Sequence, residues 1–123
     1  MGLLTKDEII KQMTTQLELT QEESELYLLL VGRGSMTIPE ISRSLSISQG
    51  DMEEAARALL RKGLIIEHPG TGRSYSALHP RMALSNVFKT FEADMMTKIR
   101  QKRAVADRLA AALIPIFEER KDA

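Results

Sequence analysis

Apolar side chains recur every three or four residues through most of the chain, which is the spacing of amphipathic helices. Four times a Ser or Thr precedes such a stretch, with an acidic residue three positions later. This pairing starts helices because the hydroxyl accepts from a first-turn N–H while the acid reaches back to the cap. The pairs are Thr5/Glu8, Thr20/Glu23, Thr37/Glu40 and Ser48/Asp51. The pattern therefore predicts four short helices.

The first two predicted helices occupy residues 6–17 and 21–31. The second stops at Gly32–Gly34, because glycine favours a helix C-terminus. Their predicted inward positions are Ile9, Ile10, Met13, Leu17, Leu26, Leu29 and Leu30. Each helix therefore has one apolar stripe to bury.

Two shorter helices follow, separated by the turn Ser46–Ser48, and the second ends at Gly63. Their predicted inward positions are Ile38, Ile41, Leu45, Met52, Ala55, Ala56, Leu59 and Leu60. Two short helices joined by a tight turn are typical of a helix-turn-helix, and small alanines permit close crossing.

After Gly63 the pattern changes from helix to strand. Leu64–Ile66 is rich in β-branched residues, Pro69–Gly72 is a turn cluster, and Tyr75–Leu78 can return as a second strand. A hairpin directly after a helix-turn-helix is the order of a winged helix-turn-helix. We therefore expect a mainly α fold with a small β-hairpin.

Pro80 opens a last segment that has no helix breaker before Pro115, where the helix should kink or end. Its apolar stripe comprises Leu84, Phe88, Phe91, Met95, Ile99, Ala106, Leu109 and Leu113. A helix over residues 81–114 is about 50 Å long, too long for a small domain to cover, so part of it needs a partner. The spacing is not a clean heptad and Lys102 lies in the seam, which favours an irregular antiparallel or crossed helix pair.

This organisation predicts two domains. Residues 1–80 form a winged helix-turn-helix with an extra N-terminal helix, and residues 81–123 form a C-terminal dimerisation helix that makes the protein a homodimer. The dimerisation residues are the apolar stripe without Ala106, namely Leu84, Phe88, Phe91, Met95, Ile99, Leu109 and Leu113.

Composition limits the class of protein. The length of 123 residues, with 43% hydrophobic and 28% charged residues, is typical of one globular core. The absence of cysteine excludes disulfides and thiolate chemistry and suits a reducing compartment. No apolar run approaches the ~20 residues of a membrane helix. We expect a cytoplasmic protein.

Charge is balanced overall but uneven along the chain. The 17 basic and 17 acidic residues cancel, while residues 1–31 carry −4, residues 32–80 carry +1 and residues 81–123 carry +3. Binding to nucleic acid would therefore need a localised basic face, because summed charge cannot attract phosphate.

An ordered set of short motifs runs through residues 17–88. The motifs are Leu19–Thr20, Glu25, Tyr27–Leu28, Gly34, Thr37–Ile41, Ile47–Ser48, Leu59, Lys62–Ile65, Tyr75, Ala77 and Pro80. In this order they resemble the DNA-binding domain of the TrmB-type archaeal transcription regulators and their short stand-alone relatives. The resemblance implies a winged helix that binds double-stranded DNA and regulates transcription without catalysis.

Two features differ from the family pattern. Larger members carry a C-terminal effector domain that binds sugars, whereas 43 residues follow Pro80 here, so no small-molecule ligand is predicted. The helix that should enter the major groove carries Asp51 and Glu53, where the family often has a basic or hydroxyl residue and a Tyr. Acids repel phosphate, although they accept from cytosine N4. The alternative function is therefore a protein–protein adaptor in a transcription complex.

Candidate DNA-binding residues lie on the helix-turn-helix and the wing. Gln49 stands at the helix N-terminus, where side chains of such helices meet base edges. Arg57 either contacts DNA or pairs with Glu53 one turn earlier. Arg73 at the wing tip suits a phosphate or minor-groove contact. The full set is Thr37, Arg43, Ser48, Gln49, Gly50, Arg57, Arg61 and Arg73.

The densest basic cluster lies in the last segment and comprises Lys98, Arg100, Lys102, Arg103 and Arg108. Asp94 precedes Lys98 by four residues, so the cluster is either an exposed helix face with charge pairs or a flank that touches DNA.

Enzyme chemistry has no support in the sequence. His68 and His79 stand alone, without the spacing of a zinc site or a catalytic pair. We therefore expect neither catalytic residues nor a metal or cofactor.

Overall fold

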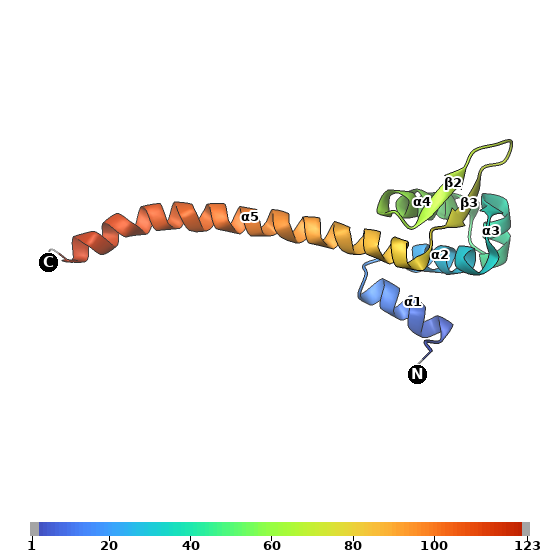
Figure 1. Cartoon of the computed structure of the whole chain (residues 1–123), viewed down its shortest axis with the longest axis horizontal. Helices are drawn as coiled ribbons and strands as arrows, with labels where there is room; N and C mark the ends of the chain where they lie inside the picture. Colours follow the sequence, from blue (N-terminus) through green and yellow to red (C-terminus); the bar gives the residue numbers. More distant parts are fainter. Residues whose placement is uncertain (1–2, 122–123) are drawn as a thin grey trace. The chain divides into compact units, whose positions relative to one another are not determined.

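The computed structural model describes residues 3–121 and is mainly helical. Its elements are α1 (Lys6–Thr15), α2 (Gln21–Arg33), β1 (Met36–Thr37), α3 (Ile38–Leu45), α4 (Gln49–Lys62), β2 (Ile65–His68), β3 (Ser74–Ala77) and α5 (Pro80–Lys121) (Figure 1). The chain divides into two compact units, Met1–Phe88 and Lys89–Ala123. The first unit has the predicted winged-helix order, and the second continues α5 from Lys89.

The predicted helix starts are confirmed in their positions. In three of them the Thr hydroxyl accepts from the Glu N–H and the Glu carboxylate accepts from the Thr N–H; these pairs are Thr5/Glu8, Thr20/Glu23 and Thr37/Glu40. Within the described chain only half of the motif forms at Ser48, whose hydroxyl accepts from the Asp51 N–H at 3.1 Å. The Asp side chain is one methylene shorter than Glu, so it reaches back less easily.

Two helix ends differ from the prediction. Helix α1 stops at Thr15, two residues early, and Glu18 then takes a positive φ of 59°. Helix α2 runs past Gly32 to Arg33, and Gly34 is its C-cap with φ 85°. The glycine that ends α2 is thus the second of the pair, because that position needs a positive φ, which a residue without a Cβ adopts readily.

The core lies where α2, α3 and α4 meet. Its largest fully buried apolar side chains are Leu26, Leu30, Ile41, Met52, Leu59 and Leu64. The Tyr27 hydroxyl donates to the Leu78 carbonyl at 3.0 Å, which fastens α2 to the end of the hairpin. Some predicted inward positions are only half-buried, namely Ile9, Leu17, Leu29, Leu45 and Leu60.

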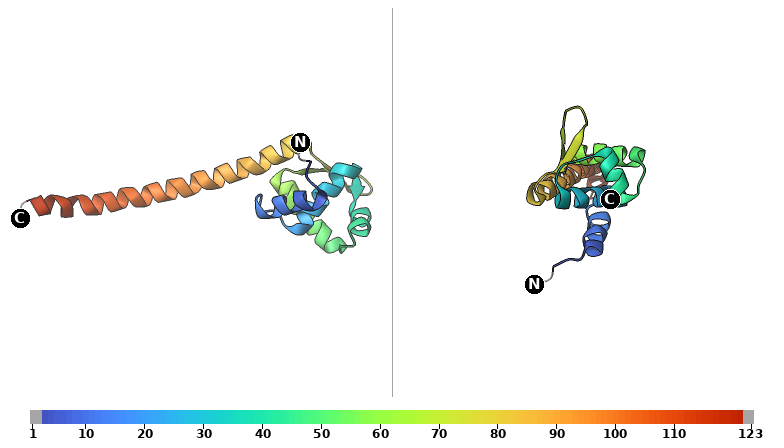
Figure 2. Two further views of the ribbon diagram at one scale, coloured as in Figure 1. Left: turned by 90° about the horizontal axis from the view of Figure 1, so that it is seen from below. Right: turned by 90° about the vertical axis from the view of Figure 1, so that its right-hand side faces the viewer.

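Strands β2 and β3 form the hairpin that we call the wing, with residues 69–73 as its loop. The wing is part of a three-stranded antiparallel sheet with the order β1-β3-β2. Strand β1 is two residues long, and its Met36 and Thr37 pair with Tyr75 and Ser74 of β3. Strand β1 was not predicted from the sequence, because two residues are too few to show alternation. Figures 1 and 2 show the loop between β2 and β3 projecting beyond the neighbouring helices.

Helix α5 does not end at Pro115 but continues to Lys121, so the prediction of an end there is wrong. Proline removes one helical hydrogen bond, and the neighbouring bonds hold the helix together. A kink at Pro115 stays a prediction. The first turns of α5 contribute Ala83 and Val87 to the core of the first unit.

Gly63, the C-cap of α4, is expected to tolerate no side chain. Its φ is +81°, and an added Cβ would lie 2.7 Å from Asn86 Nδ2, which donates to the Gly63 carbonyl at 2.8 Å. We expect Gly63→Ala to lower the free energy of unfolding by about 2–4 kcal/mol, measured by urea denaturation. The matched control is Gly32→Ala, because Gly32 is inside α2 with nothing within 4 Å of the new methyl, and should change stability by about 1 kcal/mol or less. Equal losses for both variants would contradict this account.

Candidate nucleic-acid interface

The turn that joins α3 to α4 is stabilised by a backbone hydrogen bond to the end of α3. Ser46 takes the left-handed conformation with φ 56°, and the Ile47 N–H donates to the Ser42 carbonyl at 3.2 Å. The turn delivers the chain to Ser48, which caps α4. The first residues of α4, Gln49 and Gly50, are consequently exposed at a fixed helix N-terminus.

A groove of about 690 Å³ lies between α4, the start of α3 and the wing. It is lined by Thr37, Ile38, Pro39, Gln49, Glu53, Arg57, Leu60, Glu67, Gly72, Arg73 and Tyr75, and we call it the wing groove. It brings together four of the predicted DNA-binding residues, Thr37, Gln49, Arg57 and Arg73.

A hydrogen-bonded pair fixes one wall of the wing groove. Tyr75 is a buried residue, and its hydroxyl donates to Glu67 Oε1 at 3.0 Å. Burial, followed by this bond and the charge of Glu67, raises the pKa of Tyr75 above its usual range, so the phenol remains a donor. Arg73 Nη1 lies 4.0 Å from the same Glu67 oxygen, and the Arg73 side chain is 76% exposed. The wing cation is therefore only loosely held and can reach a ligand.

The groove also contains two acids, and the prediction treated one of them, Glu53, as repulsive toward phosphate. Glu53 lies on its α4 wall and Glu67 on its wing wall. In the part of the chain that the structure describes, neither Glu53 and Arg57 nor Asp94 and Lys98 come within the 4.0 Å of an ion pair. Arg57 is thus not tied to the acid one turn before it.

Other predicted residues lie outside the wing groove. A second hollow of about 510 Å³, the acidic hollow, is lined by Thr20, Glu22, Glu23, Asp51, Glu54, Ala55, Arg57, Ala58 and Arg61. Arg61 and Asp51 therefore face a different concavity from Gln49, and Arg57 borders both. Arg43, Ser48 and Gly50 are exposed but line neither hollow.

Thr37 lines the wing groove and, as the sequence predicted, also caps the N-terminus of α3. Thr37 lines the groove while its N–H donates to Glu40 Oε1 at 3.0 Å. This backbone bond is the main cause that lowers the pKa of Glu40, with the Arg43 charge a smaller one. Thr37 is thus already engaged in capping.

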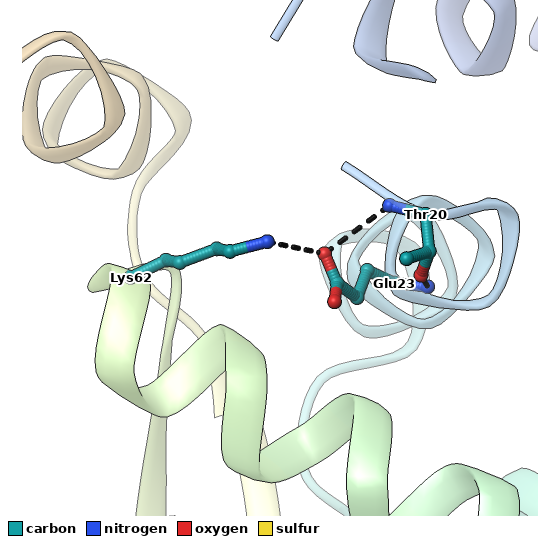
Figure 3. Close-up of polar contacts among 3 residues, drawn as sticks. All are labelled: Thr20, Glu23 and Lys62. Atoms are coloured by element: carbon teal, nitrogen blue, oxygen red, sulfur yellow. Dashed lines mark hydrogen bonds and ion pairs between the residues drawn. The ribbon is translucent and has the colours of Figure 1, made fainter. Parts of the chain in front are cut away.

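An ion pair that the sequence did not predict positions α4. Lys62 Nζ lies 2.7 Å from Glu23 Oε1, and the same oxygen accepts from the Thr20 N–H at 3.2 Å (Figure 3). Glu23 is buried, so the end of α4 is fastened to the first turn of α2. The capping motif identified Glu23, but nothing local identifies a partner 39 residues away.

The predicted dimerisation residues present apolar surface along α5. Phe91 is half-buried, and the others are exposed, from 43% for Leu84 to 63% for Met95. The structure adds exposed large apolar side chains of α5 outside that set, namely Met82, Met96, Val105, Ile114, Ile116 and Phe117. The basic cluster from Lys98 to Arg108 is exposed as well.

The two histidines take part in local hydrogen bonds. His68 Nε2 lies 2.7 Å from Ser76 Oγ on the neighbouring strand, and His79 Nδ1 accepts from the Arg81 N–H at 3.1 Å. Residues 3–121 contain no group of three His or acidic side chains that could hold a metal ion. None of the described helices combines the length and apolar character needed to cross a membrane.

A helix-turn-helix whose second helix faces a hairpin wing across a groove defines a winged-helix domain. Residues 13–81 match the family described as "Sugar-specific transcriptional regulator TrmB". This match covers more than half of the chain, so the chain belongs to the TrmB family.

A curated relative is similar over almost the whole chain. The chain is 24% identical over 115 residues to the "DNA-binding HTH-type transcriptional repressor TrmBL2" of Thermococcus kodakarensis, an overlap that covers 94% of this chain and 44% of that protein. The chain thus spans less than half the length of this curated relative.

Solved structures share the fold. One described as "Structure of TrmBL2, an archaeal chromatin protein, shows a novel mode of DNA binding" has a TM-score of 0.80 at 21% identity, covering 91% of this chain and 43% of that one. Another, a mutant of MepR from S. aureus bound to an oligodeoxyribonucleotide, has a TM-score of 0.54 at 16% identity, covering 93% and 88%. At such identities these likenesses describe the fold alone.

Proposed function

We propose that this chain is a sequence-specific, double-stranded DNA-binding transcriptional regulator that acts as a homodimer and performs no catalysis. The observation that carries the proposal is the wing groove, where Gln49 and Arg57 of α4 meet Arg73 of the wing. TrmB family membership supports it, as do the DNA-binding relatives.

The side-chain chemistry of the groove residues suits two roles, reading base edges and contacting phosphates. Gln49, exposed at the N-terminus of α4, has an amide that can pair with the N6 and N7 edge of adenine. Arg57 and Arg73 carry guanidinium groups suited to phosphates, which position the protein without reading sequence. Residues 1–80 then bind DNA, and residues 81–123 join two copies through their exposed apolar stripe.

A second candidate function rests on the acids of the same groove. Glu53 and Glu67 give the wing groove as many carboxylates as guanidinium groups. A basic protein segment would satisfy those carboxylates, as expected of an adaptor in a transcription complex. DNA is the favoured ligand because the highly exposed Arg73 projects on the wing and Gln49 starts the helix.

The test is titration of labelled duplexes followed by fluorescence anisotropy at two salt concentrations. Arg73→Ala should weaken binding to every sequence similarly and make the salt dependence shallower by about one unit per subunit, because it removes a phosphate contact. Gln49→Ala should instead reduce preference at particular base pairs by about 1–3 kcal/mol. Lys11→Ala, which removes a charge on the exposed surface of α1, is the matched control and should bind as the unaltered protein does.

Two results would separate the candidate functions. Failure of the folded protein to bind any duplex at low salt would refute the DNA-binding proposal and favour the adaptor. Equal losses on selected and random duplexes for both groove variants would instead refute sequence reading, leaving DNA binding without base preference.

A further inference from the structure

Helix α5 has one face, here called the seam, that repeats every seven residues without interruption. The repeat is continuous when Lys98, rather than Ile99, is assigned to that face. The first seam position, a, is occupied by Phe88, Met95, Lys102, Leu109 and Ile116. The second, d, is occupied by Leu84, Phe91, Lys98, Val105 and Ala112. Except for the half-buried Phe91, all these side chains are exposed in the single chain. The seam is therefore an unpartnered helix face with two lysines at its middle.

We propose that this face pairs with the same face of a second copy, antiparallel and centred on residue 100. The inference rests on the proposed homodimer and specifies how it is built. Antiparallel helices place a residues opposite d residues. In this register Met95 faces Val105 of the second copy, Leu109 faces Phe91, and Ile116 faces Leu84.

Charges that flank the seam select this orientation. In an antiparallel pair, positions just before a in each heptad face one another across the seam, and Asp94 then lies opposite Arg108 of the second copy, twice by symmetry. In a parallel pair, Asp94 faces Ile99 of the second copy and Arg108 faces Leu113, so neither charged side chain has an oppositely charged partner across the seam. Because Asp94 and Arg108 are exposed in the single chain, both are available for that contact.

The central lysines select the register. When the pair is centred on residue 100, Lys98 of each copy lies opposite Lys102 of the other, in two adjacent layers. The long side chains let the ammonium groups reach water. A shift by one heptad sets lysines opposite Phe91 and Met95, or opposite Leu109 and Val105, and leaves two layers at one end of the seam without partners. The centred register alone covers every apolar seam residue from Leu84 to Ile116.

Cysteine cross-linking tests the register, and the chain has no native cysteine to interfere. Met95→Cys and Val105→Cys proteins are made separately, mixed, unfolded, refolded together and oxidised. The mixture should give a covalent dimer joining one of each. Either protein alone should give none, because Met95 in one copy then lies about 15 Å along the axis from Met95 in the other, beyond disulfide reach.

Charge exchange gives an independent readout. Asp94→Arg should weaken dimerisation on the order of ten-fold, and Asp94→Arg with Arg108→Asp should restore it. Light scattering on all proteins reports their oligomeric state. Self-cross-linking of Met95→Cys within dimers overturns the antiparallel register while leaving the proposed function intact. Monomers throughout overturn the dimer itself, and DNA titration of the same samples shows whether DNA binding survives.

Discussion

Replacing the two wing-groove carboxylates, Glu53→Gln together with Glu67→Gln, is expected to tighten duplex DNA binding by about ten-fold or more at low salt. Each carboxylate opposes phosphate within the groove, and Glu67 also draws Arg73 toward the protein at 4.0 Å. The gain should shrink as salt rises, because the screening length is only about 10 Å at 0.1 M. The Tyr75 hydroxyl keeps an acceptor in the new amide oxygen, so folding should be unaffected.

The matched control places the same charge change elsewhere on the domain. Glu22→Gln with Glu54→Gln also removes two carboxylates, but from the acidic hollow rather than the wing groove. We expect it to change DNA affinity much less in the same anisotropy titration. Equal gains for both pairs would show that net charge, and not groove geometry, controls affinity. Undetectable DNA binding by all three proteins would favour the adaptor.

Removing the cation from the buried ion pair is expected to destabilise the fold. Lys62→Met leaves the Glu23 carboxylate buried with only the Thr20 N–H as partner. Losing one partner of a fully buried pair costs about 3–5 kcal/mol, but the Lys62 side chain is 35% exposed, so we expect about 2–3 kcal/mol. Urea denaturation measures the free energy of unfolding.

A second substitution distinguishes lost charge pairing from lost packing. Lys62→Met with Glu23→Gln should recover at least half of the loss, because the amide oxygen still accepts from Thr20 and no buried charge remains. Arg61→Met, one residue earlier on an exposed position, should change stability by about 0.5 kcal/mol or less. A loss in the double variant as large as in Lys62→Met would contradict the pairing account.

Local signals identified most of the fold. A capping box involves residues three apart, so Thr5, Thr20 and Thr37 could be identified from their own surroundings. Helix ends were less well defined, because several residues near an end satisfy similar rules; Gly34 rather than Gly32 ends α2. Proline inside α5 was over-interpreted, since a long helix can lose one bond at Pro115 and continue.

The candidate site was only partly accessible from sequence. Arg57 and Arg61 are one turn apart and looked equivalent, yet only Arg57 reaches the wing groove. Their difference depends on where the wing packs, which is a long-range property. Glu67 carried no local signal in the sequence; it lines the groove and accepts from Tyr75 on the neighbouring strand.

The two-residue strand β1 has a mechanical consequence. Thr37 pairs with Ser74, the residue of β3 next to the wing loop, and its hydroxyl accepts from the Glu40 N–H to start α3. Tension applied to the wing therefore passes directly through one residue into the helix-turn-helix. We therefore expect a ligand that draws the wing toward itself to pull also on the first turn of α3, so that the two walls of the wing groove move together.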